Sequence, residues 1–247
     1  MFQGFYDLAS NMITQNRNLN VISNNMANVS TPGYKSDKIV ESTFRDEMIY
    51  RYDKAGKTPV GVVSRVNTAA ERVTNYSEGG LKPTERSLDF GLSGAGFFAI
   101  QTNNGVVYSR NGSFNLDNQG YLTLPGIGRV MGTNGLIRVT TDDIAVDTQG
   151  NVTGKENGEY FGRIRIVDFA DYDQLTKITG GVFRAEGQPV NAGGDTQVVQ
   201  NYVESSNVSM VNEMTSMMSG QRTLQSSAQL LRMYDRLIEK IDRVGSM

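Results

Sequence analysis

The 247-residue sequence contains no cysteine, no histidine and no tryptophan. Cysteine and histidine bind the metal in most zinc, copper and iron–sulfur sites, and they supply the nucleophile or the base in Cys-His and Ser-His-Asp enzymes. The sequence therefore excludes these metal sites and these nucleophile systems. We expect a protein without a metal, a cofactor or a catalytic residue, and the lack of cysteine suits an oxidising exterior.

Charge of one sign and long apolar runs are also missing. The chain has 24 basic and 26 acidic residues, a net charge of -2, so it lacks the basic excess that binds nucleic acid or an anionic membrane. No run approaches the roughly 20 apolar residues that span a bilayer. The first basic residue is Arg17, and polar residues interrupt residues 1–9, so we also expect no cleaved secretory signal.

Glycine is scarce at the two ends and concentrated between Gly56 and Gly194, which divides the chain into three parts. In the N-terminal part, apolar residues recur at alternating spacings of three and four, with Gln15 filling one gap, and the first proline is Pro32. This heptad pattern predicts a helix with one apolar face. The apolar positions are Phe5, Leu8, Met12, Leu19, Ile22 and Met26.

The C-terminal part repeats this pattern over a longer stretch and predicts a second helix. Its main row consists of Met210, Met214, Met217, Gln221, Leu224, Ala228, Leu231, Asp235 and Ile238. A second row widens the apolar face with Leu230, Tyr234, Leu237, Ile241 and Val244. Opposite charges three or four residues apart predict surface ion pairs between Arg232 and Asp235, Arg236 and Glu239, and Glu239 and Arg243.

Two such helices could form a hairpin or bundle core within one chain, or they could pack between chains. Gln, Asp, Met and Ala occupy core positions of the rows, and mixed rows specify partner and register more than monomer stability. The helices also lie at opposite ends of the chain, so closing the loop between them requires the domain in between. We therefore favour assembly between chains through both rows.

The middle of the chain predicts β structure. The dipeptide Asn-Gly, which favours the type I′ turn of a β-hairpin, occurs at residues 104–105, 111–112, 134–135 and 157–158. A repeat of the form apolar-x-apolar-Asp-x-Gln-Gly-x-apolar-Thr contains Asp117 in one copy and Asp147 in the other. In each copy we expect the Asp to bond its own backbone and the Gly to adopt a left-handed conformation. Repeated hairpins of this kind predict a meander or a small barrel.

The densest acidic cluster consists of Asp168, Asp171 and Asp173. It could form a calcium site or the carboxylate pair of a glycosidase, or it could be a solvated turn after a strand at 163–167. The spacing lacks the central Gly and the distal Glu of an EF-hand loop. We favour the turn.

A helix stop follows the first heptad row, and it reads Asn24-Asn25-Met26-Ala27-Asn28-Val29-Ser30-Thr31-Pro32-Gly33-Tyr34-Lys35. Amides and hydroxyls can cap the helix, and Pro-Gly turns the chain. Twelve residues in this order resemble the N-terminal signature of the flagellar axial family, whose members build the rod, the hook and the hook–filament junction. Met26 and Tyr34 replace the Leu and Phe that are usual in that signature.

Two further blocks resemble the same family, in the same order. The second comprises residues 88–98 and Tyr-Ser-Arg-Asn-Gly-Ser-Phe at 108–114, and the third begins at Ser206-Asn207-Val208-Ser209. The chain departs from the family after Arg222, where Thr-Leu-Gln replaces the common Ala-Tyr-Glu. The short length and the lack of a large central insertion resemble a rod protein, of the distal type narrowly over the proximal type.

The resemblance implies a structural subunit of the flagellar basal-body rod, exported without a cleaved signal, and not an enzyme. Such a subunit would polymerise through its terminal helices into a hollow shaft that transmits torque and lines the export channel. Its expected partners are further copies of itself, neighbouring rod and hook proteins, and the flagellar export apparatus. The rival interpretations are an exported carbohydrate-active enzyme that uses Asp168 and Asp171, and a secreted binding module.

The predicted fold class is α+β, with terminal heptad helices forming a coiled-coil-like assembly domain around a central all-β domain. The expected parts are an N-terminal helix within 1–45, a linker or extended segment at 46–85, a β-rich domain at 86–200 and a C-terminal helix within 201–247. The assembly residues are expected to be Phe5, Leu8, Met12, Leu19, Ile22, Met26, Asn24, Asn25, Asn28, Thr31, Gly33, Tyr34, Met214, Met217, Leu224, Leu231 and Ile238.

Overall fold

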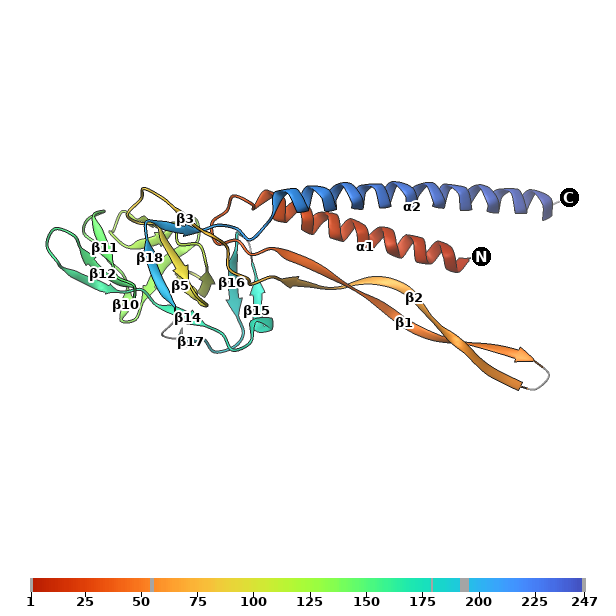
Figure 1. Cartoon of the computed structure of the whole chain (residues 1–247), viewed down its shortest axis with the longest axis horizontal. Coiled ribbons are helices and arrows are strands. Elements are labelled where there is room, and N and C mark those ends of the chain that lie inside the picture. The colour runs from red at the N-terminus through yellow and green to blue at the C-terminus, as the bar shows by residue number, and fades with distance from the viewer. Residues whose placement is uncertain (1, 54–55, 179, 192–195, 246–247) are drawn as a thin grey trace. The chain divides into compact units, whose positions relative to one another are not determined.

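The chain is α+β, with a helix near each end and a strand-rich centre (Figure 1). The computed structural model describes residues 2–53, 56–178, 180–191 and 196–245. None of the helices in these ranges has an apolar stretch that could cross a membrane.

The chain divides into two compact units. The first, which we call the helical unit, contains Met1–Ala27, Asp37–Asn75 and Ser209–Met247. The second, which we call the β unit, contains Asn28–Ser36 and Tyr76–Val208. Residues 28–36 therefore belong to the β unit although the segments on both sides of them belong to the helical unit.

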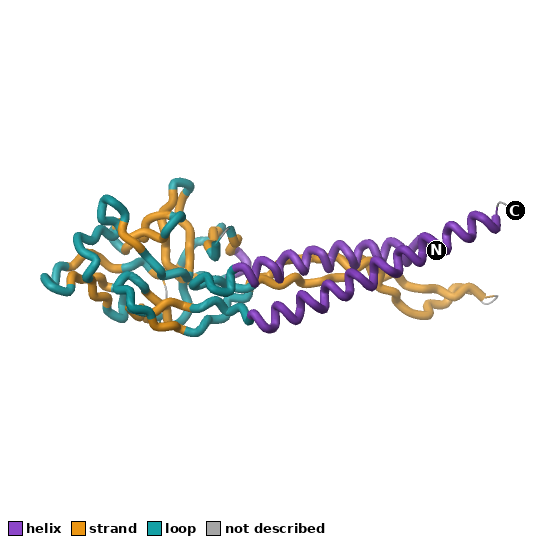
Figure 2. Tube along the Cα trace, turned by 90° about the horizontal axis from the view of Figure 1, so that it is seen from above, coloured by secondary structure: helices purple, strands orange, loops and turns teal. Residues whose placement is uncertain are grey.

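In the helical unit, α1 (Phe2–Ala27) and α2 (Met210–Gly245) lie side by side and antiparallel (Figures 1 and 2). Glycines set the distance between them. A Cβ added to Gly4 would lie 2.9 Å from the hydroxyl of Tyr234, and one added to Gly220 would lie 2.9 Å from the side chain of Leu19. Glycine at these two crossings lets the larger side chain of the other helix approach the backbone.

The helical unit also contains a long antiparallel hairpin of β1 (Asp37–Asp53) and β2 (Gly56–Thr74), which contacts α1. The strands pair from Asp37 opposite Thr74 to Asp53 opposite Gly56. Much of the range 46–85, expected to be a linker or an extended segment, is thus paired as strands. The N-terminal helix, expected within 1–45, ends at Ala27, just before the turn at Pro32 and Gly33.

Among the described residues, the largest sheet of the β unit has ten strands. Seven follow in the order β15 (Leu175–Lys177), β16 (Val182–Ala185), β6 (Gly105–Ser109), β5 (Phe97–Thr102), β9 (Gly128–Gly132), β8 (Leu122–Leu124) and β7 (Asn115–Leu116). The others are β10 (Gly135–Leu136) on β9, β14 (Ile166–Asp168) on β5, and β17 (Val190–Asn191) on β14.

Smaller sheets complete the β unit. They are β11 (Ile144–Val146), β12 (Asn151–Gly154) and β13 (Tyr160–Arg163); β18 (Gln197–Gln200) with β4 (Phe90–Ser93); and β19 (Tyr202–Glu204) with β3 (Leu81–Pro83). A short 3-10 helix, η1, spans Tyr172–Gln174. Two apolar clusters form the interior, one around Phe90, Phe98 and Phe114 and a smaller aromatic one around Phe97 and Phe183.

The Asn-Gly dipeptides do not form the predicted type I′ turns. That turn requires positive φ at both central residues, and none of the four Asn residues has positive φ. Hairpins do form at three of the sites: Gly105 (φ +115°) and Gly135 (φ +132°) each open the returning strand, and Asn157-Gly158 lies in the loop between β12 and β13. The glycine therefore adjusts the start of the strand, and the loop lies one residue earlier than predicted.

The prediction for the Asp-x-Gln-Gly repeat is confirmed. In both copies, one carboxylate oxygen of the Asp accepts hydrogen bonds of 2.8–2.9 Å from the N–H groups two and four residues later. Gly120 and Gly150 have φ of +80° and +81°. Burial alone would raise the pKa of Asp117 and Asp147, but these N–H groups and the neighbouring Arg129 and Arg163 outweigh it and hold both pKa values below the ordinary range.

These lowered pKa values predict how the β unit responds to acid. Because the folded pKa lies below the unfolded one, the stabilisation is complete above about pH 4 and is lost as pH falls through the folded pKa. Asp147→Asn should therefore lower the thermal midpoint of the β unit at pH 7, and the difference from the wild type should shrink below about pH 4. Thermal melts followed by circular dichroism between pH 3 and pH 7 measure this, and a difference independent of pH would contradict it.

Candidate assembly surface

The residues of the predicted helix rows differ in how far the pairing of α1 with α2 covers them. The least exposed positions of α2 form a row facing α1, which we call the inner row, and it includes the residues that contact Gly4 and Leu19. From the predicted set, Met217, Leu224 and Leu231 belong to it, whereas Met214 and Ile238 are 46% and 38% exposed. The full inner row is Glu213, Met217, Gly220, Leu224, Ser227, Ala228, Leu231 and Tyr234.

On α1, Ile22 is buried and Phe5 is 37% exposed. The other predicted row members, which are Leu8, Met12, Leu19 and Met26, are half-buried. The pairing of α1 with α2 within one chain therefore covers part of the predicted apolar rows. This agrees with the alternative in which the two helices form a hairpin.

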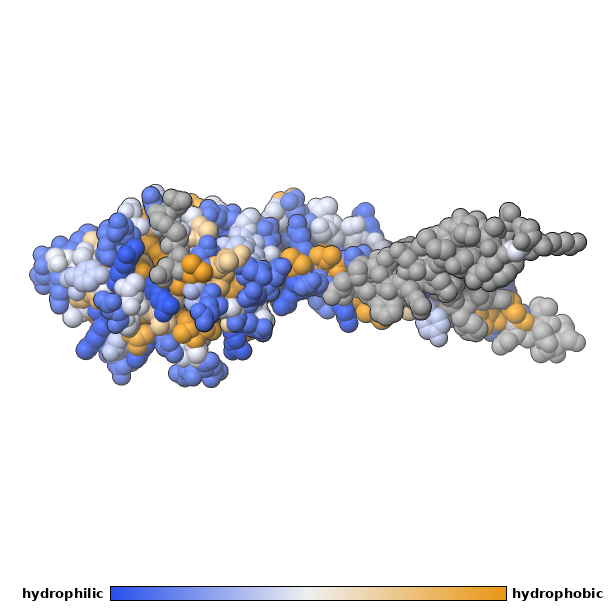
Figure 3. Space-filling model, turned by 90° about the horizontal axis from the view of Figure 1, so that it is seen from below, coloured by the Kyte–Doolittle hydropathy of each residue, from blue (hydrophilic) through white to orange (hydrophobic). Residues whose placement is uncertain are grey.

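Beyond the inner row, α2 carries large apolar side chains in solvent. Near the start of the helix these are Val211, Met214 and Met218, at 73%, 46% and 53% exposed. Near its end they are Leu230, Met233, Leu237 and Ile241, at 39–55% exposed. Exposed groups of large apolar side chains are typical of interaction sites. By contrast, the face of the β unit in Figure 3 is mainly polar, with small separate apolar groups.

Asn25 joins three elements of the helical unit. Its side chain donates to the Asp37 carbonyl at 2.9 Å and to Glu213 Oε1 at 3.2 Å, and its Oδ1 accepts from the Asp37 N–H at 3.0 Å. The amide is buried and lies where α1 ends, β1 begins and α2 begins. Asn25 was expected to be an assembly residue, and its contacts in the structure lie within the chain. Its neighbour Asn24 is exposed.

The segment after α1 turns tightly inside the β unit. Thr31 donates from its N–H to the Asn28 carbonyl, and its hydroxyl donates to the Asn28 side chain. Gly33 has φ +66°, and a Cβ there would lie 2.3 Å from the carbonyl carbon of Arg110. A residue with a side chain cannot occupy this position without displacing the backbone that follows β6.

Lys35, Glu204 and Arg110 form a buried charged cluster. Lys35 Nζ lies 2.6 Å from Glu204 Oε1 and donates to the Ser77 carbonyl at 2.8 Å. Arg110 Nη1 lies 3.3 Å from the other oxygen of Glu204. Burial lowers the pKa of Lys35, although the adjacent Glu204 carboxylate partly offsets this effect.

Two members of this cluster come from different sequence blocks, and the third stands just before the remaining block. Lys35 ends the N-terminal signature, Arg110 lies in the central block, and Glu204 stands two residues before the Ser206 that opens the C-terminal block. The buried ring of Tyr34 packs beneath the Lys177 amine, 3.8 Å from the ring centre. Lys35 and Arg110, from blocks far apart in sequence, thus both pair with the Glu204 carboxylate.

Sequence reasoning missed Glu204 because it does not stand inside a quoted motif. A buried Lys and a buried Arg in two separate motifs require a carboxylate partner, so the two motifs together provide the signal. Asn207 belongs to the third block, but its contact was not predicted: its Oδ1 accepts from the Ser36 N–H at 2.7 Å.

The acidic cluster forms turn contacts. Asp168 accepts from the Tyr172 hydroxyl at 2.8 Å, and Asp171 caps η1 by accepting from the Asp173 N–H at 3.0 Å. Burial raises the pKa of Tyr172, and the hydrogen bond to the Asp168 carboxylate raises it further. Each contact satisfies a local donor, as expected for the turn alternative.

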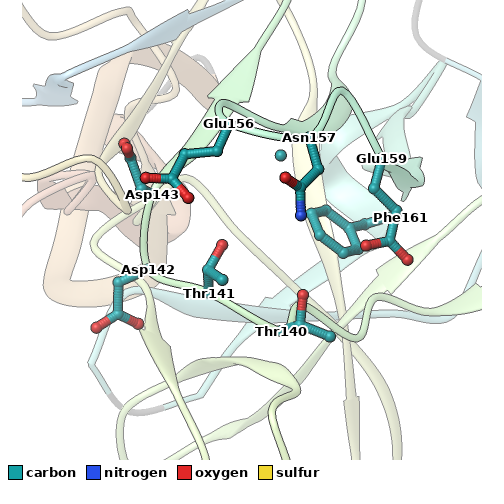
Figure 4. A pocket seen from close by; sticks show the side chains of 9 residues that line it. Thr140, Thr141, Asp142, Asp143, Glu156, Asn157, Glu159 and Phe161 are labelled. Carbon is teal, nitrogen blue, oxygen red and sulfur yellow. The ribbon is translucent and has the colours of Figure 1, made fainter.

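A recess of about 320 Å³ on the β unit is lined by four other acidic residues (Figure 4). Asp142 and Asp143 lie on one side of it and Glu159 and Phe161 on the other. Lys155 pairs with Asp143 at 3.3 Å on the surface. Within the described part of the chain, no group of three or more acidic residues has the arrangement needed to hold a metal ion.

Two of the three predicted ion pairs on α2 do not form. Arg243 lies 2.7 Å from Glu239, as predicted. In the described residues, Arg232 and Arg236 have no ion pair with Asp235 or Glu239. Both arginines are exposed, and water competes well for such side chains on a helix surface.

Three family models match the chain in order. They are described as "Flagella basal body rod protein" on residues 5–35, "Flagellar hook protein FlgE/F/G D1 domain" on residues 91–154, and "Flagellar basal body rod FlgEFG protein C-terminal" on residues 199–244. Together they span more than half of the chain and coincide with the three sequence blocks.

Whole-chain relatives agree with these models. The flagellar basal-body rod protein FlgG of Bacillus subtilis (strain 168) is 30% identical, over 98% of this chain and 98% of its own. FlgG of Buchnera aphidicola subsp. Schizaphis graminum is 29% identical, over 93% and 95%. The rod protein FlgF of Caulobacter vibrioides is also 29% identical, over 94% and 93%.

The buried cluster predicts a large effect from one change. Glu204→Gln would leave Lys35 and Arg110 without their carboxylate, and breaking such a buried pair costs about 3–5 kcal/mol. The free energy of unfolding of the β unit, measured by urea denaturation, should fall by about that amount. Glu85→Gln is the control, because Glu85 is exposed, and it should change the value by about 0.5 kcal/mol or less. Equal effects of the two changes would contradict the assignment.

Proposed function

We propose, since this chain belongs to the flagellar basal-body rod protein family, that it polymerises through its terminal helices into a hollow shaft that transmits torque and surrounds an export channel. Membership of that family makes it a structural subunit of the basal-body rod and not an enzyme. The rival interpretations, a carbohydrate-active enzyme and a binding module, lose their basis. Asp168 and Asp171, which the enzyme would have used, accept hydrogen bonds from backbone N–H groups of their own turn.

The observation that carries the proposal is the exposed apolar side of α2. A 36-residue helix that already packs its inner row against α1 still exposes nine large apolar side chains among its described residues. A helix that only closes a hairpin needs one apolar face. A second apolar face is expected where the helix also packs against other copies of the chain.

The helical unit is the proposed assembly domain. Its two helices, which come from the parts expected within 1–45 and 201–247, would continue across copies as coiled-coil-like layers. The predicted assembly residues act in two ways in this proposal. Exposed members such as Phe5, Met214 and Ile238 contact other copies. Members buried in the chain, such as Ile22 and Asn25, hold the helices in the geometry that assembly requires. We also propose that the strands of the β unit close as a meander or barrel.

The proposed partners follow from the family. They are further copies of this chain, neighbouring rod and hook proteins, and the export apparatus, which would pass the chain without a cleaved signal. Among rod types we propose the distal one, weakly favoured because most of the relatives above are FlgG proteins. The site of action is the flagellar basal body.

Met214→Asp tests assembly separately from folding. A charge on the outward side of α2 should block packing between copies, because a buried unpaired charge costs several kcal/mol. The purified variant should keep the thermal midpoint of the wild type, since Met214 is 46% exposed in the single chain. Cells that carry it should lack complete rods in electron micrographs of isolated basal bodies.

Asn212→Asp is the matched control. Asn212 is exposed and stands two residues earlier, on another side of α2, so it adds the same charge outside the apolar row. Cells with this change should swim normally. Normal rods with Met214→Asp would mean that the apolar side of α2 is not an assembly surface.

A further inference from the structure

Asp7 is the single acidic residue of α1, and the structure leaves it without a partner. The side chain is half-buried, and one of its carboxylate oxygens has no access to solvent and no hydrogen-bond donor. Across the described residues, no basic group lies within ion-pair distance of it. Partial burial of an unpaired charge is unfavourable, so such a group calls for an explanation.

The helix itself does not provide that explanation. Carboxylates are stabilised by the helix dipole within the first turn, and α1 begins at Phe2, so Asp7 stands in the second turn. The neighbouring α2 does not provide it either. The antiparallel pairing sets Gly4 against Tyr234, so the α2 residues nearest Asp7 are those around Leu231, whose side chain is apolar.

Unpaired positive charge lies on the other helix, on a side that Asp7 of the same chain does not face. Arg232, Arg236 and Lys240 follow at intervals of four and form one exposed stripe, which we call the basic stripe. Within the described residues none of the three has an ion pair. Arg232 lies about 100° around the helix from Leu231, and Arg236 about 200° from Tyr234, so the basic stripe turns away from the inner row.

An apolar row accompanies the basic stripe along its whole length. Met233, Leu237 and Ile241 each follow one member of the stripe and are 51%, 55% and 50% exposed. Apolar side chains also stand beside Asp7, where Phe5 is 37% and Tyr6 is 64% exposed. The two surfaces thus have opposite unpaired charges and matching apolar neighbours.

We propose that the N-terminal end of α1 in one copy docks on the outward side of α2 in a second copy, with the carboxylate of Asp7 paired to the basic stripe. The other carboxylate oxygen of Asp7 accepts a hydrogen bond from the basic stripe. Phe5 and Tyr6 cover Met233, Leu237 and Ile241. This inference rests on the proposed function and names the contact by which one copy recognises the next.

The contact is of the kind that an extended tube needs. It joins two different surfaces of the same chain, so each copy keeps one surface free for the next copy. Such heterologous contacts continue into open helical assemblies when their rotation does not close a ring. Charge pairing would set the register, because a displacement along the apolar row moves Asp7 away from its cation.

Charge exchange in cells tests the pairing. Asp7→Arg should reduce the number of complete rods in isolated basal bodies by about tenfold or more, because it sets like charges against each other. Arg236→Asp, the change at the centre of the stripe, should do the same. The double variant Asp7→Arg with Arg236→Asp should restore rods to within about threefold of the wild type, with Arg232→Asp and Lys240→Asp tried as alternative second changes.

Two controls separate pairing from folding. Asp7→Asn should leave the thermal midpoint of the purified full chain unchanged or raise it, because it removes an unpaired charge from the monomer. Arg17→Asp alters the other charged residue of α1, which is exposed, and should neither reduce rods nor rescue Asp7→Arg. A lower midpoint for Asp7→Asn would mean that Asp7 stabilises the single chain, which overturns the proposal.

The outcomes also separate this inference from the proposed function. Rescue by any of the three second changes supports the pairing, and rescue by none overturns it. Rods that persist when the gene is deleted would overturn the proposed function itself. Loss of rods on deletion, together with normal rods in Asp7→Arg, would overturn the pairing alone.

Discussion

The carboxylate of Glu204 is the point at which the β unit is tied together. It accepts Lys35 on one oxygen and Arg110 on the other, and both cations are almost completely buried. Two buried cations without an anion would be too costly to retain, so the three side chains hold their positions as a set. The backbone around them reinforces this, because the Gly33 N–H donates to the Glu204 carbonyl at 2.7 Å.

The same arrangement explains why the chain leaves the helical unit for nine residues. Residues 28–36 carry Gly33, Tyr34 and Lys35 into the β unit, and the chain returns to the helical unit at Asp37, where Asn25 bonds both backbone groups. One unit therefore depends on a buried ion cluster and the other on a buried amide, only a few residues apart in the chain. The polar residues of the N-terminal signature divide between these two tasks.

Elements that depend on neighbouring residues in the sequence were predictable, whereas the pairing of distant elements was not. The helices, the strand-rich centre and the Asp-x-Gln-Gly turns follow from periodicity and from side chains that bond their own backbone. The pairing of β1 with β2 was not predicted, because the residues between the two strands form no clear turn dipeptide and 46–85 was expected to be a linker or an extended segment. The type I′ turns were wrong because the glycine alone takes the positive φ.

The assembly residues illustrate the same limit. A heptad row identifies an apolar face, but it does not say whether that face meets the same chain or another. The structure assigns Leu224 and Leu231 to the inner row and leaves Met214 and Ile238 exposed. The ion pairs of Arg232 and Arg236 were predicted from spacing alone. On an exposed helix surface, water solvates both charges and such ion pairs gain little stability.

The separation of Lys35 from Glu204 along the chain is 169 residues. Closing a loop of that length carries a large entropic cost, and contacts of such long range slow folding. Counted from either end of the chain, Lys35 and Glu204 are both present only when more than four-fifths of the sequence is available. The buried cluster therefore delays stable folding of the β unit until most of the chain is available.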